Sequence, residues 1–239
     1  MNIIITGASK GIGFAIAKTF AAQEEMHSIG ICSRHRDEIE KAESELRAIS
    51  SKHGYFAKAC DVSLQSDVNS FVSDFEKQFG TIDALINNAG FGMFKQVLDI
   101  SKQEFESVLA TNLRGVFLFT RAVLPKMRER KSGTIITISS LAGKYSYKGG
   151  AAYCASKFAV RGLMQCLYQE VREDNIRCIT IYPGSIETDF FATAGHLEQT
   201  KIQRMLAVQD VADCVQLALR LPQSADITEL DVRPTNPKR

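Results

Sequence analysis

Short runs of β-branched and other apolar residues alternate with longer amphipathic stretches along this 239-residue chain. Runs of this length and composition are typical of buried strands, and the longer stretches are typical of helices. A regular strand–helix alternation predicts a parallel sheet with helices on both faces, since parallel neighbours need a crossover connection. We expect strands over 2–6, 28–33, 55–60, 83–87, 133–138, 176–181 and 227–232. We expect helices over about 12–24, 36–52, 64–79, 102–129, 151–174 and 209–220.

The run 133–138 is apolar at nearly every position, as expected for a strand that is covered on both faces. No proline-rich linker or low-complexity segment interrupts the alternation. The sequence therefore predicts one doubly wound α/β domain over residues 1–239, with a seven-stranded parallel sheet. Ligands of such sheets bind beyond the carboxyl ends of the strands, where the strand order reverses.

Composition excludes several classes of function. The net charge is +2 and no long run has one sign, so nothing favours a nucleic-acid or membrane partner. No apolar run approaches the ~20 residues that a membrane span needs. The six cysteines are scattered and the start of the chain does not resemble a secretion signal, which favours buried free thiols in the cytoplasm. The four histidines do not cluster with the cysteines, so no metal site is expected.

A glycine-rich turn, Thr6-Gly-Ala-Ser-Lys-Gly-Ile-Gly13, follows the first expected strand and opens the first expected helix. Gly7 would permit a tight turn, Gly11 a close approach to a pyrophosphate, and Gly13 close packing of the helix. The helix N-terminus would then face the phosphates. The alternative is a purely structural turn, since the spacing is not the general G-x-G-x-x-G pattern.

Tyr153 and Lys157 lie four residues apart in the expected helix 151–174, so they share one face. A nearby ammonium and the helix N-terminus would both lower the pKa of the phenol from its ordinary value near ~10. Such a phenol can exchange a proton with an alcohol or carbonyl oxygen, and Ser140 can donate a second hydrogen bond. The alternative is a surface tyrosine beside a surface lysine.

Together these motifs resemble the short-chain dehydrogenase/reductase family over nearly the whole chain, which implies a Rossmann-type fold. The resemblance rests on motifs in the family's order, namely the glycine turn 6–13, Asp61-Val62, Asn87-Asn88-Ala89-Gly90, Asn112, Ser140, Tyr153-Cys-Ala-Ser-Lys157 and Pro183-Gly184.

The resemblance implies a catalytic tetrad of Asn112, Ser140, Tyr153 and Lys157. In it, Tyr153 is the general acid in reduction and the base in oxidation. Lys157 lowers the pKa of Tyr153 and holds the nicotinamide ribose, while Ser140 polarises the substrate carbonyl. Asn112 fixes a kink in the long helix 102–129, which fits the poor helix propensity of asparagine.

The resemblance also implies contacts with a nicotinamide dinucleotide. The implied cofactor residues are Gly7, Ser9, Lys10, Gly11, Ile12, Gly13, Ser33, Arg34, Asp61, Val62, Asn88, Ala89, Gly90, Tyr153, Lys157, Pro183, Gly184, Ile186 and Thr188. Ser33 stands where NAD-type members carry aspartate, and Arg34 and Lys10 would pair with a 2′-phosphate. We therefore expect NADP(H). The alternatives are that Arg34 is a solvated charge, or that Asp37 or Glu38 serves a 2′-hydroxyl; both acids are expected in the first turn of the next helix.

Aromatic and apolar residues follow three of the motifs, which favours a flat or hydrophobic carbonyl substrate. They are Phe91, Met93, Phe94, Leu141, Tyr145, Tyr147, Phe190 and Phe191, with a substrate loop over about 188–206. Arg161 could meet an acidic substrate, but a surface position is favoured. The Arg233-Pro234-Thr235 ending resembles the sepiapterin-reductase-like and carbonyl-reductase branch.

The sequence thus predicts an NADPH-dependent reductase of ketones or aldehydes. Reduction of a 3-oxoacyl thioester and a non-catalytic NADP(H) sensor are the alternatives. The family resemblance implies a homodimer or homotetramer that pairs through helices 102–129 and 151–174.

Overall fold

The computed structural model describes residues 1–187 and 205–235 and confirms the predicted alternation. The strands are β1 (Asn2–Thr6), β2 (Ser28–Ser33), β3 (Gly54–Ala59), β4 (Ala84–Asn87), β5 (Gly133–Ile138), β6 (Ile176–Pro183) and β7 (Glu229–Val232). The helices are α1 (Gly11–Ala21), α2 (Arg36–Ile49), α3 (Gln65–Phe79), α4 (Lys102–Leu109), α5 (Gly115–Glu129), α6 (Ala151–Val171) and α8 (Val208–Arg220). Short helical turns are η1 (Val97–Asp99), η2 (Ala110–Arg114), η3 (Leu141–Gly143) and η4 (Arg172–Asp174).

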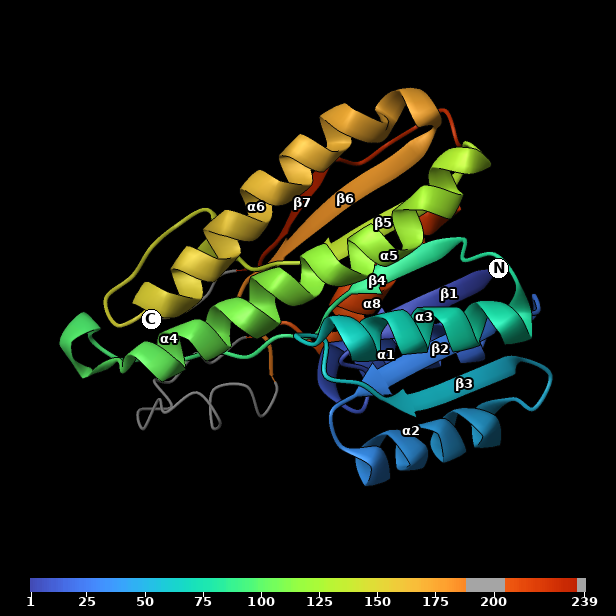
Figure 1. Cartoon of the computed structure of the whole chain (residues 1–239), viewed down its shortest axis with the longest axis horizontal. Coiled ribbons are helices and arrows are strands. Elements are labelled where there is room, and N and C mark those ends of the chain that lie inside the picture. Colours follow the sequence, from blue (N-terminus) through green and yellow to red (C-terminus); the bar gives the residue numbers. More distant parts are fainter. Residues whose placement is uncertain (188–204, 236–239) are drawn as a thin grey trace.

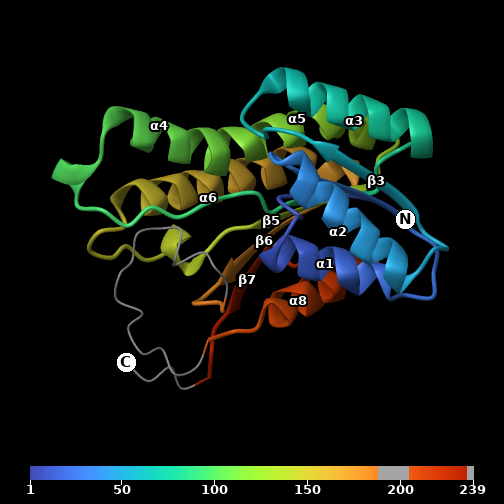
Figure 2. The same cartoon turned by 90° about the horizontal axis from the view of Figure 1, so that it is seen from below.

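The seven described strands form one parallel sheet in the order β3-β2-β1-β4-β5-β6-β7. The order reverses between β1 and β4, so the crevice beyond their carboxyl ends is the expected ligand site. Helices α1, α2 and α8 cover one face of the sheet, and α3, α4, α5 and α6 cover the other (Figures 1 and 2).

Successive residues of β1 enter different cores, which shows how the two layers form. Ile3 and Ile5 pack with α1, α2 and α8, whereas Ile4 packs on the opposite face with Phe71 and Phe75 of α3. Strand side chains alternate between faces, so a strand covered on both sides must be apolar throughout. All six residues of β5 are buried, as its sequence predicts.

Three helices end earlier than expected, and the one predicted over 151–174 stops at Val171. The helix predicted to reach residue 52 stops at Ile49, where the Tyr55 hydroxyl of β3 donates to the backbone oxygens of Leu46 and Ser50. The Leu46 oxygen also accepts the last helical bond, from the Ser50 nitrogen, whereas the Ser50 oxygen is one that a longer helix would have used. The helix predicted to reach residue 24 ends at Ala21.

The continuous helical stretch Lys102–Glu129 is the one segment, among the described residues, long and apolar enough by composition to cross a membrane. Arg114 and Arg121 interrupt its apolar residues, so it contains no continuous apolar run of ~20 residues. Its α5 part contributes Val116, Leu118 and Phe119 to the core beneath α3, and 44% of its apolar window is buried. It is therefore best described as a core helix of the fold.

The cysteine prediction is confirmed in part. All six cysteines are free thiols, but Cys166 is exposed and Cys214 only half-buried. Among residues 1–187 and 205–235, no three His, Cys, Asp or Glu side chains come together in a way that could hold a metal ion.

Candidate active site

The glycine turn lies between the ends of β1 and β4. Gly7 has φ +64°, and a Cβ there would sit 2.7 Å from the Cα of Ala89. At Gly13 a Cβ would sit 2.5 Å from the side-chain nitrogen of Asn88 and from the Gly7 oxygen. Both positions therefore require glycine, because no heavy atom tolerates such an approach.

Asn88 fastens this turn to the neighbouring strand. Its Nδ2 donates to the backbone oxygens of Thr6 and Gly7, each at 3.0 Å. The Thr6 hydroxyl accepts from the backbone nitrogens of Asn88 and Ala89, also at 3.0 Å. The turn that opens α1 is thus held in place from β4, and the unpaired backbone N–H groups at the start of α1 face the crevice beyond it.

A cavity of about 610 Å³ runs along these strand ends to the start of α6. It is lined by Gly7, Ser9, Lys10, Gly11, Ile12, Ser33, Arg34, His35, Glu38, Cys60, Val62, Asn88, Ala89, Gly90, Phe91, Thr111, Ile138, Ser139, Tyr153, Lys157, Glu187 and Val208. Most of the residues expected to contact a dinucleotide lie on its wall, which extends from the glycine turn to the Tyr153 phenol. The volume suits a large ligand.

Asp61 does not line this cavity, although its neighbours Cys60 and Val62 do. The Asp61 carboxylate accepts bonds from the backbone nitrogen and the hydroxyl of Ser63, at 2.9 and 2.7 Å. This geometry is that of a turn residue that closes its own loop.

At the end of the cavity nearest β2, the structure differs from what the sequence suggests. Lys10 was expected to be available for a phosphate, but its Nζ lies 3.9 Å from the carboxylate of Glu38, and the Ser9 hydroxyl donates to that carboxylate at 3.1 Å. Glu38 and Asp37 do occupy the first turn of α2, as predicted. Ser33 lines the cavity and donates its hydroxyl to the His35 oxygen at 3.1 Å.

At the other end, Tyr153 lies in the first turn of α6 and Lys157 one turn later, both buried. The Lys157 Nζ lies 5.8 Å from the centre of the Tyr153 ring and donates to the Ile138 oxygen at 3.2 Å. The Ser140 hydroxyl is hydrogen-bonded to the Tyr153 phenol and accepts from the Ala142 nitrogen at 3.1 Å. The expected phenol, ammonium and hydroxyl therefore meet at one place.

The expected direction of the Tyr153 pKa is wrong for this structure. Burial raises the pKa of Tyr153 to about 12, and the hydrogen bond with Ser140 lowers it only in part. Burial also lowers the pKa of Lys157 to about 8. Desolvation disfavours both a buried ammonium and a buried phenolate, and it is the largest effect on each group. The phenol is therefore protonated at neutral pH.

Asn112 accounts for an irregular turn in the long helix. It lies in η2, a π-helical turn between α4 and α5, and is buried. Its side chain exchanges two 3.0 Å hydrogen bonds with the backbone of Phe91, and its Nδ2 also donates to the Ser156 hydroxyl at 3.1 Å. An amide that bonds outside its own helix accounts for the wider turn. Asn112 thereby joins the segment after β4 to the face of α6 that carries Ser156.

Residues 1–199 match the model of the short chain dehydrogenase family. The chain belongs to this family. It is 32% identical to a sepiapterin reductase of Chlorobaculum tepidum, over 98% of this chain and 96% of that protein. An alcohol dehydrogenase of Thermococcus sibiricus, solved with 5-hydroxy-NADP, superposes with a TM-score of 0.89 at 28% identity, over 100% of this chain and 97% of that one. A metagenomic short-chain oxidoreductase solved with NADP gives a TM-score of 0.83 at 31% identity, over 98% and 97%.

The last motif of this short-chain dehydrogenase is only partly described. Pro183 ends β6, and the Gly184 nitrogen donates to the Val232 oxygen of β7 at 2.8 Å. Ile186 pairs with Leu206, so the two ends of the expected substrate loop lie together. Thr188, Phe190, Phe191 and most of that loop lie outside the described residues.

Sequence reasoning missed several cavity residues. Ser139 is the most informative, because its buried hydroxyl has no hydrogen-bond partner within the described part of the chain. Thr111 and Val208 also line the cavity without having been expected there. Phe91, which the sequence placed beside the substrate, lines it too.

Proposed function

We propose that the protein is an NADPH-dependent oxidoreductase that reduces a ketone or aldehyde to an alcohol. The observation that carries this proposal is the single cavity that joins the glycine turn to the buried Tyr153 and Lys157 side chains. Family membership supports redox chemistry with a nicotinamide, and two of the similar structures carry an NADP species. The cofactor supplies the hydride.

Tyr153 acts as the general acid in this proposal. A phenol with a pKa of about 12 carries its proton at neutral pH and can donate it to the oxygen of a carbonyl as that oxygen becomes an alkoxide. Ser140, already bonded to the phenol, orients the same oxygen. Lys157, in its charged form, stabilises the phenolate that remains and holds the ribose of the cofactor. Asn112 positions this turn of α6, because it donates to the Ser156 hydroxyl, which donates to the Tyr153 backbone oxygen.

The cofactor would lie with its phosphates at the glycine turn and its nicotinamide near Tyr153. Gly7, Gly11 and Gly13 give the backbone access that a pyrophosphate needs. The cations Lys10 and Arg34 support NADP(H) at the end nearest β2, since both line the cavity there. Glu38 opposes this preference, because its carboxylate lies 3.9 Å from the Lys10 Nζ.

An aromatic wall beside the phenol supports a flat or apolar substrate. The Phe94 ring lies 6.1 Å from that of Tyr153 and 5.9 Å from that of Tyr147, centre to centre. Tyr147 remains protonated, since burial raises the pKa of its phenol. Planar conjugated carbonyl compounds, of which sepiapterin is one, fit such a surface.

Two other functions compete with this one. A 3-oxoacyl thioester reductase would need cations at the mouth of the site for an acidic carrier, but Arg161 is bonded to Glu229. A non-catalytic sensor of NADP(H) would have no use for a phenol, hydroxyl and amine gathered at the cavity end.

The test is turnover. Purified protein with NADPH and a panel of planar diketones, quinones, pterin ketones and a 3-oxoacyl thioester should oxidise NADPH with the planar ketones, followed by nicotinamide absorbance. Binding of NADPH without turnover of any of these compounds would favour the non-catalytic sensor. Turnover of the thioester alone would favour the 3-oxoacyl thioester reductase.

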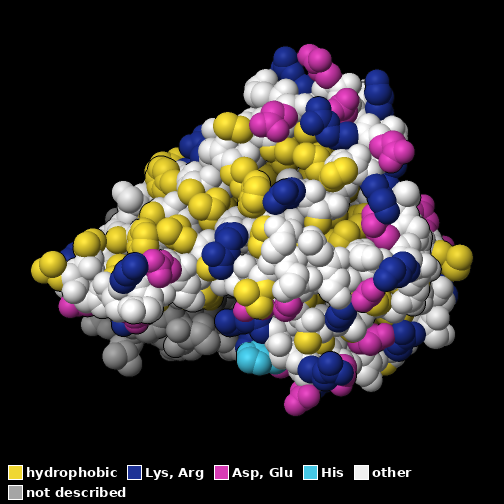
Figure 3. Space-filling view, in the orientation of Figure 1, with side chains coloured by type: hydrophobic (Ala, Val, Ile, Leu, Met, Phe, Trp, Pro, Cys, Tyr) yellow, Lys and Arg dark blue, Asp and Glu magenta, His cyan; other side chains and the backbone are white. Residues whose placement is uncertain are grey.

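We also propose that the protein is a homodimer or homotetramer in the cytoplasm. Apolar side chains gather over α4, α5 and α6 on one face (Figure 3), where Phe105, Phe117 and Phe158 are about 40% exposed. This pattern is typical of a surface covered by a second copy. The free thiols suit a reducing compartment. Light scattering of the Phe117→Asp variant should show a smaller assembly.

A further inference from the structure

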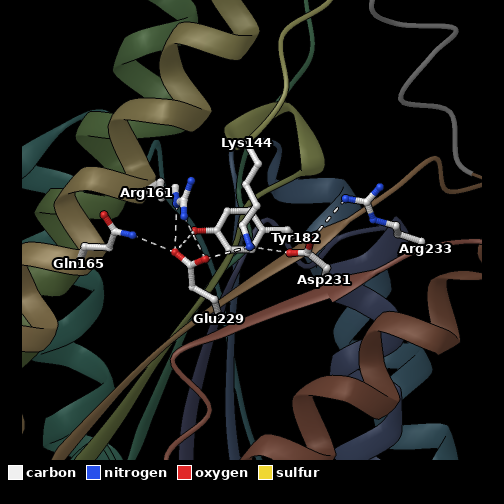
Figure 4. A network of polar contacts seen from close by, with 7 residues as sticks. All are labelled: Lys144, Arg161, Gln165, Tyr182, Glu229, Asp231 and Arg233. Carbon is white, nitrogen blue, oxygen red and sulfur yellow. Dashed lines mark hydrogen bonds and ion pairs between the residues drawn. The ribbon is translucent and has the colours of Figure 1, made fainter.

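The Glu229 carboxylate of β7 collects hydrogen bonds from side chains of three different elements (Figure 4). Lys144 follows η3, Arg161 and Gln165 belong to α6, and Tyr182 lies in β6. Their donor atoms lie 2.8, 3.0, 3.0 and 3.1 Å from the Glu229 oxygens. Such a convergence on one partly buried carboxylate exceeds what a surface ion pair provides.

Lys144 connects Glu229 to the loop that carries Ser140. It stands four residues after Ser140 and immediately after η3. Its Nζ also lies 2.7 Å from Asp231 and 4.1 Å from the centre of the Tyr182 ring. Within the same loop, a Cβ on Gly143 would sit 2.9 Å from the Lys157 oxygen. The loop therefore lies directly against the Lys157 turn of α6, and Lys144 anchors its far end.

Arg161 connects Glu229 to the helix that carries the phenol and the amine. It lies one helical turn after Lys157, and Gln165 lies one turn further. The Arg161 Nε and Nη2 reach the two carboxylate oxygens at 3.0 and 3.3 Å, a two-point contact that fixes orientation as well as distance. The same carboxylate thus holds the Ser140 loop and the Tyr153–Lys157 helix.

The contacts are ionic across the working pH range. Burial alone would raise the pKa of Glu229, but hydrogen bonds from Lys144, Arg161 and Tyr182 hold it at about 2. Burial opposes the charge on Lys144 too, yet its bonds to Asp231 and Glu229 raise its pKa. Neither group titrates near neutrality, so the link persists wherever the enzyme works.

We propose that Glu229 is a positioning residue, which sets the distance between the Ser140 hydroxyl and the Tyr153 phenol by joining their two elements. This inference rests on the proposed function. It gives the last strand of the sheet, which lies outside the cavity, a part in catalysis. The link acts on proton transfer and leaves the glycine turn, at the opposite end of the cavity, untouched.

The decisive variant is Glu229→Gln, which keeps the shape of the side chain and removes its charge. The matched control is Glu76→Gln, since the Glu76 carboxylate is also partly buried and pairs with Lys126 at 2.7 Å on a remote face. Three quantities are measured in each: kcat for carbonyl reduction, the dissociation constant of NADPH by fluorescence, and hydrogen exchange of segment 141–149.

We expect Glu229→Gln to lower kcat by about tenfold, to leave NADPH affinity within about twofold and to speed exchange in 141–149, since small displacements of reacting groups are costly. Glu76→Gln should change none of these. Glu229→Asp should recover part of kcat. The double variant Lys144→Met, Glu229→Gln should have a kcat no lower than that of the slower single variant, since both substitutions break the same Lys144–Glu229 link.

A kcat of Glu229→Gln equal to that of the control would overturn the proposal. So would a parallel loss of NADPH affinity, or losses that multiply in the double variant. If the unaltered protein reduces no carbonyl, the proposed function fails, yet hydrogen exchange still decides whether Glu229 holds the loop: faster exchange supports the link, and unchanged exchange refutes it.

Discussion

The Glu38 carboxylate lies 3.9 Å from the Lys10 Nζ, inside the cavity where a 2′-phosphate would be bound. Glu38 thereby partly neutralises a cation expected to select NADP(H). Replacement by Gln should tighten NADPH about three- to tenfold and leave NADH nearly unchanged, because the loss of one like charge at this range is worth ~1 kcal/mol.

The matched control for this prediction is Glu40→Gln on the same helix, whose carboxylate pairs with Arg36. Dissociation constants of NADPH and NADH, or of 2′,5′-ADP and 5′-AMP, provide the measurement. Equal NADPH affinities in the Glu38→Gln and Glu40→Gln variants would show that Glu38 does not oppose the phosphate.

Arg34 should act in the opposite sense. It lines the same end of the cavity, and Arg34→Asp would replace an attraction for the 2′-phosphate by a repulsion. We expect NADPH affinity to fall tenfold or more (about 1.4 kcal/mol per factor of ten) while NADH binds as before. An unchanged ratio of the two kcat/KM values would remove Arg34 from the site.

Lys157 should be costly to stability. Burial lowers its pKa from about 10.5 to about 8, so the unfolded chain binds more protons between these values and the free energy of unfolding rises with pH there. Below pH 8 the folded protein bears the full free-energy cost of burying the charged Lys157 side chain. At pH 7 the free energy of unfolding of Lys157→Met should therefore exceed that of the unaltered protein by about 1 to 3 kcal/mol. The variant should also lose turnover.

Denaturant unfolding at pH 7, beside the exposed Lys102→Met, checks the stability prediction for Lys157. Loss of stability in Lys157→Met would mean that its bond to the Ile138 oxygen outweighs the cost of burying its charge.

The stacked pair His27 and His53 should make the protein sensitive to acid. Their rings are 5.6 Å apart, and burial lowers the pKa of His27 to about 4 and that of His53 below its usual value. The unfolded chain then binds more protons between about pH 6.5 and 4, so stability is lost as the pH falls through this window. In His27→Gln the decrease in the free energy of unfolding across this pH window should be smaller by about 1 to 2 kcal/mol. Equal slopes of unfolding free energy against pH in both proteins would contradict it.

Local patterning was enough to predict the sheet and most helix bounds, because each strand and helix is apolar on the faces it buries. The bounds of β1, β2 and β5 coincide with the expected ones. The end of α2 was missed because it depends on the Tyr55 hydroxyl, which arrives from the next strand. Such a contact leaves no trace in the local sequence.

The glycine turn and the proximity of Tyr153 and Lys157 were predicted because each depends on a fixed spacing. The environment of Tyr153 was not, since its pKa depends on burial by elements that the spacing does not specify. The contact of Glu38 with Lys10 and the links of Glu229 arise between segments distant in the chain. Sequence alone names the candidate groups, and packing decides their charges and partners.

In the proposed mechanism the Tyr153 phenol protonates a carbonyl oxygen. The most direct measurement is the turnover of Tyr153→Phe with a carbonyl compound that the unaltered protein reduces, set beside its NADPH affinity. We predict a fall in kcat of at least about a hundredfold with NADPH bound as tightly as before. A Tyr153→Phe variant that keeps its turnover would contradict the account.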